Sequence, residues 1–205
     1  MEARQYQSAM LADLAGRRGA LDARITPLAP HMKIAGPAFT VEVRPGDNLM
    51  FHAALALAQP GDVIIVDGKG DSTTAQCGAI MSAEAEAAGI AGFVVYGAVR
   101  DTEELRHGQF PIFSIGSNPN GPTRSLPGRI NWPISVGGTA VCPGDLVVGD
   151  CDGVVVIPKE LVTDILEQAQ NKYSSEVKRL GEIAKGNLRP AWLESALQDI
   201  GISLN

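Results

Sequence analysis

The chain has 205 residues, a net charge of −6, and a composition that is 45% hydrophobic and 20% charged, which is ordinary for a globular domain with its own core. The acidic balance argues against a broad nucleic-acid-binding surface, although a local basic pocket for an anionic substrate stays open. Its three cysteines have no CxxC spacing, so they predict neither a zinc site nor a disulfide framework and indicate a reduced, cytoplasmic protein.

Strands and helices alternate through the first part of the chain. The N-terminal residues are too polar for a signal peptide and fit a helix through Met10–Ala15, and no run approaches a membrane span of roughly 20 apolar residues. Strands are predicted at Ala38–Val43, Val63–Val66, Gly92–Val99 and Phe110–Gly116, with helices at Asn48–Ala58 after an Asp47 N-cap, at Ala79–Ala88 before Gly89, and within Asp101–Gly108. This alternation, with a glycine-rich loop expected at Val66–Ser72, predicts parallel strand pairing.

The pattern changes after the last of these strands. Residues Ser117–Pro133 are rich in Pro, Gly and Asn and predict a long irregular loop, of functional or interface character. Short apolar runs between glycine turns then predict antiparallel hairpins up to Pro158. From Lys159 a long helix is expected, with an apolar stripe at Leu161, Ile165, Ala169, Tyr173, Val177 and Leu180, and a last helix over Ala191–Ile200. We predict one α/β domain, residues 1–205, with residues 159–205 as a helical extension.

Two charged residues end the most apolar strand. Arg100 and Asp101 follow GFVVYGAV, at the carboxyl end of a parallel strand, where α/β proteins bind ligands. An arginine fork fits a carboxylate, and an aspartate offers a hard oxygen ligand to Mg²⁺. An ordinary surface ion pair is the alternative interpretation.

The segment Gln76–Met81 supplies a second candidate wall. It opens a helix, whose first N–H groups lack internal partners and favour anions, and Gly78 permits close approach of a ligand to the backbone. Lys69, between glycines, is a weak Schiff-base candidate because it is expected to be solvated. His52 is interpreted as a packed residue of its helix rather than a catalytic one. No GxSxG motif or nucleotide-binding glycine loop is present.

Several segments together resemble one family. IAGPAFTVEV, GDNLMFHAAL, QPGDVIIVD, GFVVYGAVRD and CPGDLVVGDCDGVVVIP stand in this order, and the chain from about Leu11 to Gly186 resembles the RraA-like family. That family includes metal-dependent 4-hydroxy-4-methyl-2-oxoglutarate aldolases and regulators of ribonuclease E activity; some members were formerly called demethylmenaquinone methyltransferases. The family's spaced motif corresponds here to Gly78, Arg100, Asp101 and Glu104.

The resemblance implies a three-layer, swivelling β/β/α fold, a homotrimer or dimer of trimers, and a divalent cation, Mg²⁺ or Mn²⁺. It implies that Asp101 is the metal ligand, that Arg100 binds the carboxylate or keto oxygen of the substrate, and that Glu104 acts through metal-bound water. It further implies substrate contacts from the backbone of Gly78, Ala79, Ile80 and Met81.

The activity that the resemblance implies is a lyase reaction. A 4-hydroxy-2-oxo acid would be cleaved to pyruvate and a second oxo acid, with decarboxylation of oxaloacetate as a side activity. The alternative is a non-catalytic regulator that binds a ribonuclease; no nucleic-acid or membrane partner is expected. Two positions depart from the aldolase pattern: Ala79 replaces an acid, and Tyr96 replaces an Asp and is expected to alter hydrogen bonding near the site. Glu182 and Glu194 are candidates for an acid supplied to a neighbouring subunit.

Overall fold

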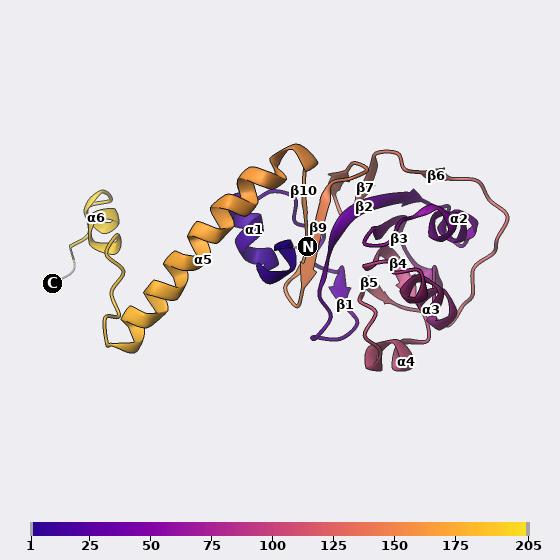
Figure 1. The fold of residues 1–205 in the computed structure, drawn as a ribbon, viewed down its shortest axis with the longest axis horizontal. Helices are drawn as coiled ribbons and strands as arrows, with labels where there is room; N and C mark the ends of the chain where they lie inside the picture. The colour runs from indigo at the N-terminus through magenta and orange to yellow at the C-terminus, as the bar shows by residue number, and fades with distance from the viewer. Residues whose placement is uncertain (1, 204–205) are drawn as a thin grey trace. The chain divides into compact units, whose positions relative to one another are not determined.

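The computed structural model describes residues 2–203, which fall into two compact units divided between Leu166 and Glu167 (Figure 1). The second unit contains most of α5 (Val162–Ala184) and α6 (Leu193–Gln198). The first unit holds two 3-10 turns, Glu2–Gln5 and Lys159–Leu161, and the elements α1 (Ser8–Leu14), β1 (Thr26–Pro27), β2 (Ile34–Glu42), α2 (Leu49–Leu57), β3 (Val63–Ala75), α3 (Ala79–Ala87), β4 (Gly92–Val99), α4 (Thr102–His107), β5 (Ile112–Ser117), β6 (Arg129–Ile130), β7 (Ile134–Val136), β8 (Thr139–Val141), β9 (Leu146–Asp150) and β10 (Gly153–Ile157).

One large sheet organises the first unit. Strands β2, β3, β4 and β5 are neighbours and pair in parallel, as the alternating pattern predicts. The first half of β2, Ile34–Pro37, pairs antiparallel with β9 instead, and β9 continues into the β10 hairpin. A second, two-stranded sheet is the β7–β8 hairpin. The expected hairpins after residue 133 are thus confirmed.

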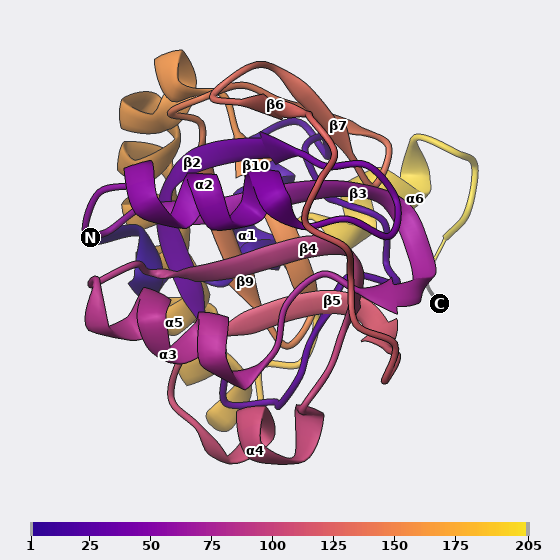
Figure 2. The ribbon, with the colours of Figure 1, turned by 90° about the vertical axis from the view of Figure 1, so that its right-hand side faces the viewer.

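Strand β3 shows how the layers arise. The first four residues of β3, Val63–Val66, are fully buried, and their side chains alternate between two hydrophobic cores. Ile64 and Val66 join the core that contains residues of α2, α3 and α4, whereas Val63 and Ile65 join the core that contains residues of β7 to β10. Figure 2 shows α2 and α3 over one face of β3–β5, with β9 and β10 on the other side. Because adjacent side chains point to opposite faces, a run of consecutive apolar residues suits this middle layer. The architecture is the predicted β/β/α arrangement.

The glycine-rich segment after Val66 belongs to strand β3, so the prediction of a loop at Val66–Ser72 is wrong. Strand β3 continues to Ala75, with register shifts against β4 after Val66 and after Asp71. Lys69 and Gly70 have φ of 58° and 71° there, and the two residues break the regular ladder without ending it. Strand β4 supplies a pairing edge on this side, which local composition does not reveal.

The C-terminal segment contains the predicted long helix. Within it Ile165 is buried, whereas Tyr173, Val177 and Leu180 are exposed. The last helix, α6, is shorter than predicted. Among the described residues, no helix is both long and apolar enough to cross a bilayer.

Candidate active site

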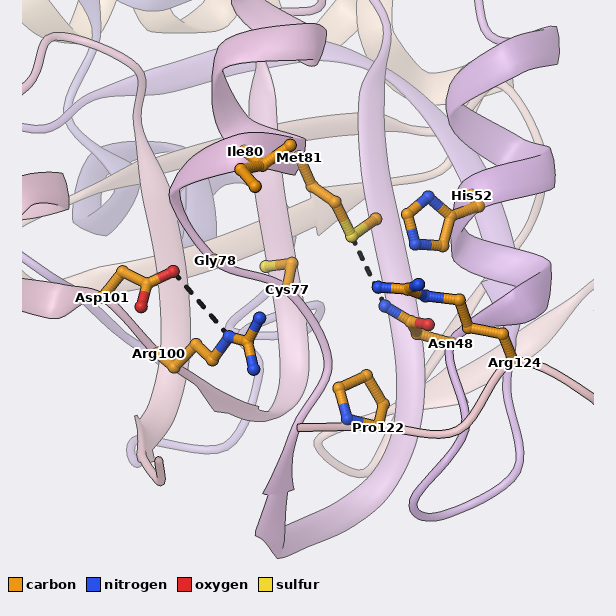
Figure 3. Close-up of a pocket in the computed structure, with 10 residues that line it drawn as sticks. All are labelled: Asn48, His52, Cys77, Gly78, Ile80, Met81, Arg100, Asp101, Pro122 and Arg124. Carbon is orange, nitrogen blue, oxygen red and sulfur yellow. Dashed lines mark hydrogen bonds and ion pairs between the residues drawn. The ribbon is translucent and has the colours of Figure 1, made fainter. Parts of the chain in front are cut away.

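A pocket opens beside the carboxyl end of β4 (Figure 3). Four segments that are distant in the chain form its walls: the junction of β4 and α4, the start of α3, the start of α2, and the irregular loop between β5 and β6. Its lining consists of Asn48, His52, Cys77, Gly78, Ile80, Met81, Arg100, Asp101, Pro122 and Arg124. The structure therefore brings together five of the site residues that the resemblance implies and adds residues of α2 and of the loop between β5 and β6; the five are Gly78, Ile80, Met81, Arg100 and Asp101.

Arg100 and Asp101 form one edge of the pocket. Arg100 Nε lies 3.8 Å from Asp101 Oδ2, and the two side chains are 41% and 42% exposed. Such an exposed, loose pair contributes little to stability, so stability does not account for it. Asp101 has a φ of 59°, a conformation that is unfavourable for a non-glycine residue and that is found preferentially at functional sites.

The Asp101 carboxylate also links β4 to the start of α3. Its Oδ2 accepts a hydrogen bond of 3.0 Å from the Ala79 N–H, which is the first N–H of that helix. The N–H groups of Ile80 and Met81 follow in the same first turn and also have no acceptor within the helix. They are therefore the first-turn donors that remain for a ligand. Of the backbone contacts that the resemblance implies, the one from Ala79 thus serves Asp101.

Gly78 is required at its position because of close packing. A Cβ built on Gly78 would collide with Asp101 Oδ2 and would lie 3.0 Å from Arg100 Cγ. Its backbone is extended, with φ of −157°, so the requirement is one of space and not of conformation. The motif glycine therefore lets α3 approach the charged pair.

The remaining motif residues lie in different surroundings. Ile80 is 75% exposed and Met81 is buried, and both line the pocket. The Ala79 side chain packs against the helix-side core. Glu104 lies outside the pocket, on the exposed surface of α4, where it shares a shallow depression with Asp101, Glu103 and His107.

Cys77 lies at the base of the pocket. Burial, and secondarily the negative charge of Asp101, raises the pKa of its thiol to about 12. The residue therefore remains a neutral thiol near pH 7 and is unsuited to act as a nucleophile.

The opposite wall depends on Asp47, which was expected to cap α2. The N-cap residue is Asn48, although Asp47 Oδ1 accepts the Leu49 N–H at 3.0 Å. Asp47 Oδ2 accepts the Thr123 hydroxyl and the Ser125 N–H, each at 2.7 Å, and the Leu126 N–H at 3.2 Å. Burial alone would raise the pKa of Asp47, but these hydrogen bonds outweigh it and hold the pKa below its ordinary value. A buried carboxylate thus fixes the irregular loop.

Asn48 and His52 on α2 reach the pocket from this side (Figure 3). Asn48 Nδ2 donates to the Gln76 carbonyl at 2.9 Å and so connects α2 with the start of α3. Within the described chain, Asn48 Oδ1 and His52 Nε2 are buried without a hydrogen-bond partner, which is unusual for buried polar atoms. The structure places His52 in the pocket lining, and its interpretation as a packed rather than a catalytic residue stays a prediction.

The pocket fits a hard divalent cation in one respect. Asp101 carries the pocket's carboxylate, it is partly exposed, and its Oδ1 makes no hydrogen bond within residues 2–203. Mg²⁺ commonly keeps several waters and takes one or two protein carboxylates together with substrate oxygens. Asp150, Cys151 and Asp152 form a tighter group of candidate ligands elsewhere, but Asp150 already accepts hydrogen bonds from the Ser8 N–H, the Ser8 hydroxyl and the Asp152 N–H.

Two other residues from the sequence analysis lie away from the pocket lining. Lys69 pairs with Asp67 at 2.6 Å and with Glu42 at 3.1 Å; burial lowers its pKa, but these carboxylates outweigh burial and raise it. The amine is therefore held as a cation, which disfavours a Schiff base. Tyr96 packs on the core opposite the helices, and its hydroxyl accepts from Arg24 at 3.2 Å. The expectation that Tyr96 alters hydrogen bonding near the site is wrong.

The sequence over residues 6–156 matches the family described as RraA-like: Aldolase/RraA. The chain belongs to the RraA-like family. A relative from Halalkalibacterium halodurans named "Putative 4-hydroxy-4-methyl-2-oxoglutarate aldolase" is 45% identical over 78% of this chain and 76% of its own length. The resemblance drawn from the motifs is thereby confirmed.

Two solved structures of RraA-like proteins are also similar to the chain. The RNA-processing inhibitor RraA of Thermus thermophilis has a TM-score of 0.69 and 31% identity, over 75% of this chain and 93% of its own. Streptomyces coelicolor RraAS2, described as an unusual member of the RNase ES inhibitor RraA family, has a TM-score of 0.78 and 30% identity, over 87% of this chain and 93% of its own. They support the fold assignment and include regulators among the relatives.

Proposed function

We propose that this RraA-like protein is a divalent-metal-dependent carbon–carbon lyase that cleaves a 4-hydroxy-2-oxo acid to pyruvate and a second oxo acid, and that decarboxylates oxaloacetate as a side reaction. The observation that carries the proposal is the meeting of Arg100, Asp101 and the start of α3 in one pocket. The aldolase name of the 45%-identical relative supports the same reaction class.

The chemistry follows from where charge develops. When the C3–C4 bond of the substrate breaks, its electron pair moves toward the C2 keto oxygen, while the 4-hydroxyl gives its proton to solvent and becomes the carbonyl of the second oxo acid. Negative charge accumulates on the keto oxygen, and protonation of the resulting enolate at C3 by solvent yields pyruvate. Arg100 would hydrogen-bond the substrate carboxylate or this oxygen and stabilise the charge. Asp101, held by the Ala79 N–H, would be the ligand of Mg²⁺ or Mn²⁺, which would supply Lewis-acid polarisation. Loss of CO₂ from oxaloacetate places charge on the same oxygen.

The decisive experiment is a pyruvate-release assay with saturating Mn²⁺, using oxaloacetate and 4-hydroxy-4-methyl-2-oxoglutarate. We expect release from both substrates, and a loss of roughly 100-fold or more in Arg100→Ala and Asp101→Ala. Arg106→Ala, on the exposed surface of α4, is the matched control and should retain activity. If the wild-type protein releases pyruvate from neither substrate, the proposal is contradicted.

A second candidate function is regulation of a ribonuclease by direct binding. The names of the two solved structures favour it. It predicts that the protein inhibits ribonuclease E in vitro and that Arg100→Ala inhibits equally well, because a protein-binding surface does not need the pocket. Loss of pyruvate release with retained inhibition would separate the two functions.

We also propose that the protein assembles as a homotrimer or a dimer of trimers and acts in the cytoplasm. The exposed apolar side chains Tyr173, Val177 and Leu180 follow one another at helical spacing on α5, and unpartnered apolar surface of this kind favours association. The three cysteines of the protein are free and two of them are exposed, which suits a reducing compartment such as the cytoplasm. A monomer by light scattering would contradict the assembly.

A further inference from the structure

Arg124 is a second arginine in the pocket. It comes from the irregular loop between β5 and β6, whereas Arg100 comes from the end of β4. Figure 3 shows the two side chains reaching toward the pocket from opposite sides. A Cβ on Gly121 of the same loop would lie 2.8 Å from Arg100 Nη1, so the loop itself passes close to the Arg100 guanidinium.

The backbone on either side of Arg124 is anchored. Thr123 and Ser125 both donate to the buried Asp47 carboxylate at 2.7 Å. Thr123 also exchanges backbone hydrogen bonds with Gly46 and Asn48, at 2.8 and 3.0 Å. Arg124 therefore projects from a fixed point rather than from a freely moving loop, which reduces the entropy lost when it binds a ligand.

The Arg124 guanidinium is available for an anion. In the described part of the chain, no hydrogen bond or ion pair engages it, and the pocket's carboxylate, Asp101, is already next to Arg100. A guanidinium matches a carboxylate with two parallel hydrogen bonds. The pocket thus presents one arginine beside the proposed reaction centre and a second, unpaired one across the cavity.

We infer that Arg124 binds a second carboxylate of the substrate, so that the protein selects dicarboxylic over monocarboxylic 4-hydroxy-2-oxo acids. The inference rests on the proposed function for the position of the first carboxylate, near Arg100. This second carboxylate belongs to the second oxo acid that the proposed reaction releases with pyruvate, and the inference assigns the residue that recognises it. Cleavage involves the keto group and the 4-hydroxyl and does not involve the second carboxylate, so Arg124 determines specificity and takes no part in bond breaking.

The test compares 4-hydroxy-4-methyl-2-oxoglutarate with the monocarboxylate 4-hydroxy-2-oxopentanoate. Arg124→Gln should raise KM for the dicarboxylate roughly 10-fold, as expected for a lost charge-assisted hydrogen bond pair at an exposed site, and leave the monocarboxylate almost unchanged. Arg124→Lys should recover part of the preference. Arg129→Gln, at the start of β6 and outside this pocket, should behave as wild type. An equal effect of Arg124→Gln on both substrates, or none, would overturn the inference while leaving the lyase proposal intact.

A binding measurement separates failure of the inference from failure of the proposed function. Calorimetry with Mn²⁺ should show tighter binding of 2-oxoglutarate than of 2-oxobutanoate to the wild type, and loss of this difference in Arg124→Gln. If no pyruvate is released but this difference is found, the lyase proposal fails and the second carboxylate site stands. Failure of 2-oxoglutarate to bind the wild type, or binding that is independent of Arg124, would overturn the inference.

Discussion

The two walls of the pocket are positioned in different ways. On one side, Arg100, Asp101 and Gly78 lie where β4 ends and α3 begins. Pairing of β4 with β3 and β5, and the hydrogen bond from the Arg100 N–H to the Cys77 carbonyl, set their places. On the other side, Arg124 lies on a loop whose position depends on one buried carboxylate, that of Asp47. A site on regular elements is sensitive to added volume, whereas a site on an anchored loop is sensitive to loss of the anchor.

Gly78→Ala should have the largest effect on activity, and it should disturb only the wall that contains Arg100 and Asp101. The added methyl group cannot be placed without moving Asp101 Oδ2 and the Arg100 side chain, and a displacement of about 1 Å can cost roughly 100-fold in rate. We expect a loss of that order in pyruvate release, measured with Mn²⁺. Gly181→Ala, whose Cβ meets open space on α5, is the matched control. Full activity in Gly78→Ala would show that the charged pair tolerates rearrangement.

Asp47→Asn should act on the second wall. The new amide would bring an N–H group against donors from Thr123, Ser125 and Leu126, and we expect a loss of about 1–3 kcal/mol in the free energy of unfolding, as for buried donors left without an acceptor. Urea denaturation measures it. Asp62→Asn occupies the same Pro-Gly-Asp context but accepts one hydrogen bond, from the Gln59 N–H, and should change the free energy less. Equal effects would argue against a special role for Asp47.

The difference in unfolding free energy between the wild type and Asp47→Asn should depend on pH in a definite direction. Because the folded-state pKa of Asp47 is lowered, its stabilisation is fully present above the unfolded-state pKa of about 3.9 and is lost as the pH falls through the lower, folded-state value. The gap between the wild type and Asp47→Asn should therefore stay constant at neutral pH and narrow in acid below that range. A gap that narrows already between pH 7 and pH 5 would contradict the lowered pKa.

Tyr96→Phe should have the smallest effect. It tests whether a residue outside the pocket lining influences activity. The phenol hydroxyl accepts one hydrogen bond from the exposed Arg24 and lies on the face opposite the helices. Its loss should cost at most about 1 kcal/mol in unfolding free energy and leave pyruvate release unaltered. A marked fall in activity would mean that the position of the bulged β3 segment beside Tyr96 influences the geometry of the pocket.

The sequence by itself predicted the order of the elements, the parallel strands, the hairpins and one wall of the pocket. These features depend on local patterns: consecutive apolar residues in β4, glycine turns between short strands, and charges directly after a strand. The parallel arrangement then places the end of β4 and the start of α3 at one edge of the sheet. The motif residues Gly78, Arg100 and Asp101 could therefore be grouped before their distances were known.

Only the tertiary structure decided the other wall and the extent of β3. Nothing local distinguishes Asp47 from the other two Pro-Gly-Asp turns, and its three partners in the loop lie 76 to 79 residues away. The strand continues through a glycine-rich segment because β4 offers it a pairing edge. Long-range partners of this kind carry no periodic signal, so the sequence indicated what one half of the site contains, and the fold determined which residues face it across the pocket.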